Sequence, residues 1–415
     1  MFMQQVLFKM STFFYLWSEL GLRKTLARYI RAILGIFFKS LKVDGKDSTS
    51  KSLIPMVTDS DLDVLLGVPE LPSHEDESRD GNQDWVWATP IFGKGSGGHH
   101  DIFMLAESAR NMGINQKIGL THGNTKLDIS HFENVIRKDY GYENLVLEDL
   151  DALQKVTNEL VIATGWQTFA PALRVPARKR AYLVQDFEPW FNPVGIQSYL
   201  AEQTYKFGIP CITAGPWLAN LMSKKYGAQS EYFDLGYDPE IYKDSGTNER
   251  NAIVIYYRPG TLRRASEFTL EVIRSVEKEI SDFEIHFVGG VPKTLPKGNV
   301  TVHGSLDHSQ LSELYQKAAV TFVLSMTNTS LVPVEALAAG SSVLSNAGEI
   351  NEMNLAGTAA SLVDLNIRKL GTVIVRLANE MNSDRANQNA KSVLGREWDV
   401  QSQKTIDFLQ ELPYA

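Results

Sequence analysis

The chain has 415 residues, of which 43% are hydrophobic and 22% are charged, a composition typical of a soluble globular protein with two or three domains. Its 41 basic and 49 acidic side chains give a net charge of −8. This balance argues against general nucleic-acid binding, because phosphate recognition needs a basic face. The single cysteine, Cys211, excludes an internal disulfide and any cysteine-based metal cluster.

Residues 1–43 are rich in aromatic, aliphatic and basic side chains, and their apolar spacing predicts a basic amphipathic helical extension. Such a helix suits the surface of an anionic bilayer, or packing on its own domain or on a second subunit in a homodimer. No apolar run is long enough to span a membrane, and no signal-peptide cleavage pattern follows. We therefore expect a cytoplasmic protein with peripheral contact to the inner face of the cell membrane. Residues 44–83 are interpreted as a linker with one ordered piece at 61–67.

From residue 84 onward, apolar runs of strand length alternate with amphipathic segments of helix length. Two such series predict two doubly wound Rossmann-like α/β domains with parallel sheets, at 84–240 and 241–395, followed by a C-terminal helix within 396–415. Ligands of these domains lie beyond the carboxyl ends of the strands, so the predicted site is the cleft between the domains. The expected strands are 85–88, 117–121, 144–147, 160–164, 181–185 and 210–214, then 252–257, 284–288, 300–303, 320–325 and 342–346.

Two loops of the first domain carry residues suited to ligand binding. The glycine-rich stretch 93–98 precedes His99, His100 and an expected helix at 101–111, and its backbone N–H groups can approach a phosphate closely. Its spacing matches neither a dinucleotide fingerprint nor a P-loop, and a plain flexible turn is the alternative. The loop 185–193 places two carboxylates among three aromatic rings, a combination that binds sugars. An acidic helix N-terminus is the alternative.

Two loops of the second domain carry residues suited to binding a nucleoside diphosphate. Arg258 and Arg263 flank a Pro-Gly turn and can converge on one diphosphate, although a solvated basic turn would look the same. The loop 325–331 leads into a helix whose N-terminus can bind an anion. Glu335, one turn into that helix, would face a ribose hydroxyl or would simply stabilise the helix.

In this order, the four loops resemble those of the family-four class of retaining GT-B glycosyltransferases, over about residues 84–412. In that class the C-terminal helix crosses back to the first domain. One position departs from the pattern, because Thr327 stands where the first acid of the Glu-x7-Glu motif is expected. The matching motifs are Gly97-Gly98, Gly236-Tyr237-Asp238, Arg258 with Arg263, Gly289-Gly290, His303-Gly304 and Glu335.

The stretches 182–191, 210–217 and 258–264 resemble bacterial rhamnosyltransferases that build cell-surface polysaccharides. This resemblance implies dTDP-L-rhamnose as donor, a lipid-linked or polysaccharide acceptor, and neither a metal nor another cofactor. The implied catalytic residues are Asp186, Glu188, Arg258 and Arg263. The implied donor-binding residues are Gly97, Gly98, Arg258, Arg263, Gly289, Gly290, His303, Thr327, Thr329, Ser330, Leu331 and Glu335. The implied acceptor-binding residues are His99, His100 and Trp190.

Three alternatives stay open on the sequence. A related transferase could use a UDP- or GDP-sugar, and Thr327 is compatible with a catalytically silent glycan-assembly subunit. A metal-dependent GT-A enzyme is the third, because Asp149-Leu150-Asp151 and Asp61-Leu62-Asp63 both fit an Asp-x-Asp motif. We favour helix capping for Asp149, before an expected helix at 152–159, and a place in the linker for Asp61.

Overall fold

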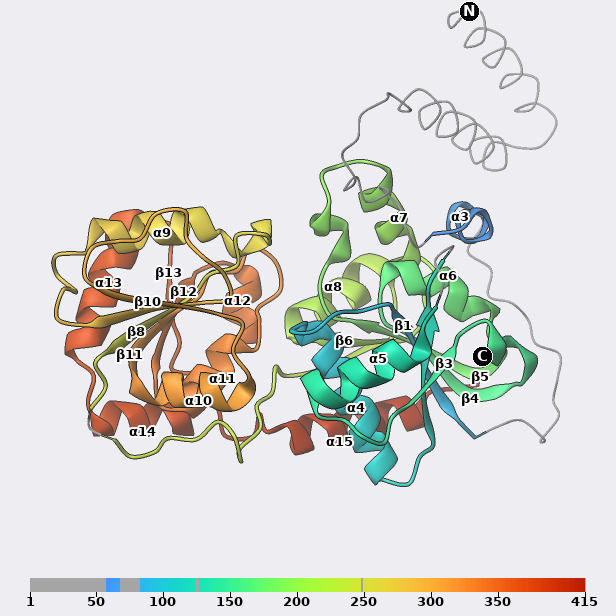
Figure 1. Ribbon diagram of the computed structural model, residues 1–415. Coiled ribbons are helices and arrows are strands. Elements are labelled where there is room, and N and C mark those ends of the chain that lie inside the picture. Colours follow the sequence, from blue (N-terminus) through green and yellow to red (C-terminus); the bar gives the residue numbers. More distant parts are fainter. Residues whose placement is uncertain (1–56, 68–82, 124–126, 248, 415) are drawn as a thin grey trace, which may run out of the picture.

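The computed structural model describes residues 57–67, 83–123, 127–247 and 249–414, which form two α/β domains side by side (Figure 1). The helical extension predicted for residues 1–43 lies outside the described residues. Each domain has one parallel sheet with helices on both faces, so the central strands are buried on both sides and read as continuous apolar runs. The predicted fold class of two doubly wound Rossmann-like domains is confirmed.

The first domain contains a seven-stranded sheet in the order β3-β2-β1-β4-β5-β6-β7. Its strands are β1 (Trp85–Pro90), β2 (Gln116–Thr121), β3 (Val146–Asp149), β4 (Asn158–Ala163), β5 (Ala177–Val184), β6 (Cys211–Ala214) and β7 (Ser230–Phe233). Its helices are α3 (Asp59–Leu66), α4 (Gly97–Asn111), α5 (Ile129–Val135), α6 (Trp166–Arg174), α7 (Ile196–Tyr205) and α8 (Pro216–Tyr226), with the short turns η1 (Ile136–Tyr140), η2 (Ala152–Lys155) and η3 (Glu188–Phe191).

The second domain contains a six-stranded sheet in the order β10-β9-β8-β11-β12-β13. Its strands are β8 (Ala252–Tyr256), β9 (Glu284–Val288), β10 (Asn299–Gly304), β11 (Ala318–Phe322), β12 (Ser342–Asn346) and β13 (Ser361–Val363). Its helices are η4 (Leu262–Arg264), α9 (Ser266–Ser275), α10 (His308–Lys317), α11 (Val332–Ala338), α12 (Glu349–Asn354), α13 (Ile367–Asn379) and α14 (Ser383–Lys391).

Several local predictions are wrong. The edge strands β7 and β13 were not predicted, because each is short and mostly half-buried and so lacks a strong apolar run. The helix expected at 152–159 is the short turn η2, followed by the first residues of β4. The helix expected at 101–111 begins four residues earlier, at Gly97, so the two glycines and both histidines lie in its first turn.

The ordered piece expected at 61–67 is the helix α3, which a capping box between Thr58 and Asp61 begins. Asp61 also pairs with Arg174 at 2.5 Å, and Leu62 and Leu65 are buried against the first domain. The capping box and the ion pair together give both oxygens of the Asp61 carboxylate a partner within the protein.

The C-terminal helix α15 (Trp398–Glu411) lies against α4 and β7 of the first domain, below the sheet in Figure 1. At the junction the two crossing segments pair, because the Tyr237 N–H donates to the Arg396 carbonyl at 3.3 Å and the Trp398 N–H donates to the Tyr237 carbonyl at 3.1 Å. Gly236 fits only as glycine, since a Cβ there would lie 2.6 Å from the Trp398 ring. The domains are thus joined by two connections that touch each other.

Candidate functional site

The carboxyl ends of the two sheets meet through the loops that follow β5 and β11. Asp186 accepts hydrogen bonds from the Thr327 hydroxyl at 2.8 Å, from the Asn328 N–H at 3.1 Å and from its own neighbour Phe187 N–H at 2.8 Å. The Asn328 amide donates to the carbonyls of Gln185 at 2.7 Å and Ala214 at 2.8 Å. The acidic loop of the first domain and the small-polar loop of the second therefore face each other in direct contact.

Three arginines from the turn after β8 lie near this contact, and they have different partners. Arg263 Nε lies 3.7 Å from Asp186 Oδ2, and its guanidinium lies 4.3 Å from the centre of the Phe191 ring. Arg264 donates to the Ser325 hydroxyl at 2.7 Å, and burial lowers its pKa, with the charges of Arg263 and Arg258 acting in the same direction. Arg258 donates to the Tyr256 hydroxyl at 3.3 Å. Arg264 therefore holds the loop 325–331 in place, a role that the sequence pattern does not indicate.

Buried polar atoms without a hydrogen-bond partner gather at these loops. Among the described residues, nine buried side-chain atoms lack such a partner, and six of them belong to the loops predicted from the sequence or to the first five residues of α4. Leaving such an atom unpaired costs about 1–3 kcal/mol, so proteins rarely do so without a reason. A polar ligand bound between the loops would supply the missing partners. The six are His99 Nε2, His100 Nδ1, Asp101 Oδ1, Gln185 Oε1, Arg263 Nε and Ser330 Oγ.

The glycine-rich loop lies beside the acidic loop. A Cβ on Gly98 would come within 3.1 Å of Gln185 Oε1, so glycine allows the close approach of α4. His99 Nδ1 lies 2.8 Å from the Ser96 hydroxyl, and burial lowers the pKa of His99 to about 4. Burial and the nearby His308 lower the pKa of His100 to about 3. Both imidazoles are therefore neutral near pH 7.

Two buried carboxyl groups, Glu335 of the second domain and Asp101 of the first, have raised pKa values. Glu335 in α11 accepts a hydrogen bond from Tyr242, whose hydroxyl lies 2.7 Å from His308 Nδ1. Burial raises the pKa of Glu335 to about 8, and burial together with the charge of Glu335 raises the pKa of Asp101 to about 8. Glu335 stands out in the sequence, whereas Asp101, Tyr242 and His308 do not, because their roles come from contacts between distant segments.

These raised pKa values predict a pH-dependent stability. A carboxyl group in the unfolded chain has a pKa of about 4, and in the folded chain these two have a pKa of about 8. Such a group contributes its full stabilisation below about pH 4, and this contribution is lost as the pH rises through 8. We expect the free energy of unfolding, measured with urea, to fall between pH 5 and pH 8 by up to about 1.4 kcal/mol per pH unit for each group. Glu335→Gln or Asp101→Asn should flatten this slope. The exposed Glu313→Gln is the control, and an equal slope in all variants would contradict the prediction.

The other predicted site residues have varied surroundings. Glu188 accepts hydrogen bonds from the Trp166 N–H at 2.6 Å and the Tyr182 hydroxyl at 3.4 Å, so one of its oxygens is bound to the start of α6. Trp190 is half exposed beside Trp217. Thr329 donates to Asn351 at 2.7 Å, and Leu331 precedes α11.

The glycine pair after β9 lies at the side of Arg258, and His303 lies near the end of β10. A Cβ on Gly289 would lie 2.7 Å from Arg258 Cδ, and one on Gly290 would lie 2.6 Å from Pro259 Cδ. Both glycines therefore make room for the turn that carries the arginines. His303 Nε2 lies 2.9 Å from His286 Nδ1, so this ring faces a second imidazole.

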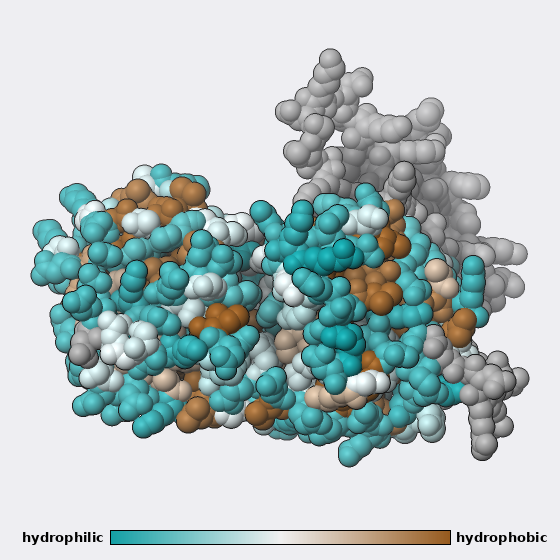
Figure 2. Space-filling view, turned by 60° about the horizontal axis from the view of Figure 1, so that its bottom comes forward, coloured by the Kyte–Doolittle hydropathy of each residue, from teal (hydrophilic) through white to brown (hydrophobic). Residues whose placement is uncertain are grey.

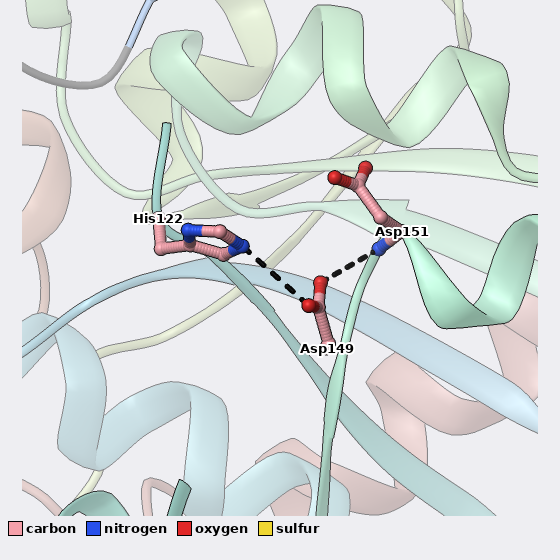
Figure 3. A group of neighbouring side chains, drawn as sticks. All are labelled: His122, Asp149 and Asp151. Carbon is pink, nitrogen blue, oxygen red and sulfur yellow. Dashed lines mark hydrogen bonds and ion pairs between the residues drawn. The ribbon is translucent and has the colours of Figure 1, made fainter. Parts of the chain in front are cut away.

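His122, Asp149 and Asp151 offer ligand atoms within 4.8 Å of one another at the ends of β2 and β3 (Figure 3). Asp149 accepts a hydrogen bond from the Asp151 N–H at 3.0 Å and lies 3.5 Å from His122 Nε2. Figure 3 shows the Asp151 carboxylate directed away from this pair. Asp149 therefore stabilises a tight turn, and not the helix predicted to follow it.

Solved structures share this two-domain arrangement over most of the chain. S. aureus TarM, solved with fondaparinux, alpha-GlcNAc-glycerol and UDP, covers 79% of this chain and 100% of its own at 8% identity, with a TM-score of 0.63. Anabaena HepE, solved with UDP-glucose, covers 79% of this chain and 100% of its own at 13% identity, with a TM-score of 0.61. The chain has the GT-B fold. This fold excludes the GT-A alternative.

Sequence comparisons find one matching family model and a relative from O-antigen biosynthesis. Residues 251–375 match the family model described as WsaF, C-terminal domain. The O-antigen biosynthesis protein RfbC of Myxococcus xanthus is 25% identical over 281 residues, which are 64% of this chain and 22% of that protein. The chain thus spans about a fifth of the length of this relative. Together with the fold, these matches support a glycosyltransferase of GT-B type.

Proposed function

We propose that the chain is a retaining GT-B glycosyltransferase that transfers L-rhamnose from dTDP-L-rhamnose onto a growing bacterial cell-surface polysaccharide. The observation that carries the transferase proposal is the group of six unpartnered, buried polar atoms at the facing loops. The similarity to an O-antigen biosynthesis protein supports a surface glycan as product. The resemblance of residues 182–191 and 258–264 to rhamnosyltransferases supports the donor.

A related donor is the second candidate, favoured by the UDP and UDP-glucose bound in the HepE structures. Both donors present a pyrimidine nucleoside diphosphate to the site, and they differ in the pentose, the base and the sugar. Arg258, Arg263 and Ser330 would bind the diphosphate, Glu335 would bind the ribose, and the glycine pair 289–290 with His303 would lie by the base. His99, His100 and Trp190 would face the acceptor.

The proposed transfer needs no protein base on the acceptor. The bond between the anomeric carbon and the diphosphate oxygen breaks, the acceptor oxygen bonds to that carbon on the same face, and the acceptor proton passes to the departing phosphate. The protein then contributes positioning and electrostatic stabilisation. This fits the two histidines, whose lowered pKa values make them weak bases.

A thermal-shift screen tests the donor, because a ligand of the folded state raises the melting temperature by mass action. We expect dTDP-L-rhamnose and TDP to raise it more than UDP- or GDP-sugars do. Hydrolysis or transfer of the same sugar, followed by release of TDP, should accompany the shift. Binding without any turnover would favour a catalytically silent assembly subunit, and a preference for UDP-glucose would favour the second donor.

Activity is expected to survive exhaustive EDTA treatment, because two arginines and a helix N-terminus offset the charge of the diphosphate. The measurement is nucleotide release before and after chelation. Asp149→Asn is the matched variant, since Asp149 belongs to the group best placed to hold a metal ion. Complete loss of activity that manganese restores, and that Asp149→Asn reproduces, would contradict metal-independent transfer.

The acceptor is proposed to be lipid-linked, with peripheral contact of the protein to the inner face of the cell membrane. No helix in the described part of the chain has the length and apolar character to cross a membrane. The face shown in Figure 2 is mostly hydrophilic, with small separate apolar patches on both domains. Residues 1–43 remain the segment predicted to make the contact.

A further inference from the structure

Thr327 lies at the position where the resemblance places an acid, and a carboxylate from another segment nevertheless lies beside it. It belongs to Asp186 of the first domain, which accepts a hydrogen bond from the Thr327 hydroxyl at 2.8 Å. Both residues are buried, with 4% and 8% of their surface exposed. We infer that Thr327 is a positioning residue that orients the Asp186 carboxylate across the domain boundary for catalysis. This inference rests on the proposed transferase function.

The surroundings of Asp186 hold its carboxylate in one orientation. Oδ2 accepts a hydrogen bond from the Thr327 hydroxyl, and Oδ1 accepts hydrogen bonds from the N–H groups of Asn328 and Phe187. Hydrogen bonds to a carboxylate favour its charged form, whereas burial disfavours it. For Asp186 burial is the larger effect and raises the pKa, while Asn328, Thr327 and the cations Arg263 and Arg264 of η4 oppose it. Burial raises the pKa of the second acid of this loop, Glu188 of η3, to about 8, and the charge of Asp186 acts in the same direction.

Thr327 and its neighbour Asn328 have separable roles. The Asn328 side chain donates to two carbonyls of the first domain and accepts from the Asn354 amide at 2.6 Å, so it ties three segments together. Among the described residues, the Thr327 hydroxyl has one hydrogen-bond partner, the Asp186 carboxylate. Asn328 therefore holds the domains in contact, and the Thr327 hydroxyl adds only the orientation of the carboxylate.

The location of this carboxylate suggests its part in the transfer. Asp186 Oδ2 lies 3.7 Å from Arg263 Nε, an atom without a hydrogen-bond partner that is suited to the diphosphate. As the bond to the diphosphate breaks, positive charge develops on the sugar and negative charge on the leaving group. A fixed carboxylate stabilises the positive charge on the sugar, and the fixed guanidinium beside it stabilises the negative charge on the leaving group. The pair is complete only when both domains contribute to it.

The test compares Thr327→Val, which removes the hydroxyl at nearly constant volume, with Thr327→Ser, which keeps it. With the nucleotide sugar that the wild-type chain turns over, Thr327→Val should lower kcat 10- to 100-fold and change KM for the donor less than threefold. Thr327→Ser should stay within threefold of wild type. The acid limb of the pH–rate profile should move to higher pH in Thr327→Val, because the lost hydrogen bond raises the pKa of Asp186.

A double mutant and a titration separate this inference from the proposed function. Thr327→Val should cause no further loss in an Asp186→Asn background, since the hydroxyl acts through that carboxylate. Carboxyl-carbon NMR, assigned by comparison with Asp186→Asn, should show a higher pKa of Asp186 in Thr327→Val than in Thr327→Ser, whether or not the chain turns over sugar. Equal pKa values, or additive losses of kcat, would overturn the inference. Absent turnover in wild type would overturn the transferase proposal instead.

Discussion

Arg263→Ala is expected to weaken the binding of a nucleoside diphosphate by about 10- to 150-fold, the effect of losing a charged hydrogen bond worth about 1.5–3 kcal/mol. Its Nε is buried without a hydrogen-bond partner among the described residues, and its guanidinium stacks on Phe191. The side chain is therefore already held in place for a ligand, and little ordering is lost on binding. Calorimetric titration with TDP and UDP measures the effect, and Arg258→Ala should fall in the same range.

Two other arginines of the second domain separate a contact with the diphosphate from a structural effect, and the first of them is the control. Arg274 lies on α9 and pairs with Glu271, so Arg274→Ala should leave the affinity within twofold of wild type. Arg264 is bound to Ser325 and to the Asn328 carbonyl, so Arg264→Ala should lower the melting temperature as well as the affinity. Unchanged affinity in a folded Arg258→Ala/Arg263→Ala double variant would contradict the assignment of these arginines to the diphosphate.

Leu409→Ala is expected to lower the free energy of unfolding by about 2–5 kcal/mol, as large-to-small changes in a packed core do. Leu409 is completely buried where α15 lies on the first domain, in the same core cluster as Phe103 and Met104 of α4. Urea unfolding followed by circular dichroism measures the loss. Deleting the chain from Arg396 would remove Trp398, Ile406 and Leu409 together, and we expect that variant to aggregate.

Val400 supplies the matched control for Leu409, because it lies on the same helix and 51% of its surface is exposed. Val400→Ala should change stability by less than about 0.5 kcal/mol. If the truncated chain kept wild-type stability and nucleotide affinity, α15 would have no part in holding the first domain together.

The alternation of apolar runs and amphipathic segments was enough to predict the fold, because buried parallel strands leave a strong pattern. It failed at β7 and β13, where a strand at the sheet edge is short and half exposed. It also failed at residues 152–159, where an amphipathic pattern continues from the turn η2 into β4. In each case pairing with a neighbouring strand determines the structure, and this pairing cannot be predicted from the local sequence.

The residues suited to ligand chemistry were visible in the sequence, but their partners were not. Asn328 is an ordinary loop residue until it meets Gln185, 143 positions earlier in the chain. Asp101 looked like the first residue of a helix, but burial in the folded chain and the charge of Glu335 from the other domain raise its pKa. The missing acid at Thr327 was evident from the sequence. The Asp186 carboxylate 2.8 Å from its hydroxyl was evident only from the structure.

The paired crossings at the junction restrict how the domains can move. A single connecting strand would allow one domain to swivel freely about the other. Here the segment at Tyr237 is hydrogen-bonded to the segment from Arg396 to Trp398, and Gly236 lies directly against the Trp398 ring. Two connections that are bonded to each other leave less freedom for one domain to twist about the other than a single connection would. This restriction favours a constant register between Asp186 and Thr327, which belong to different domains.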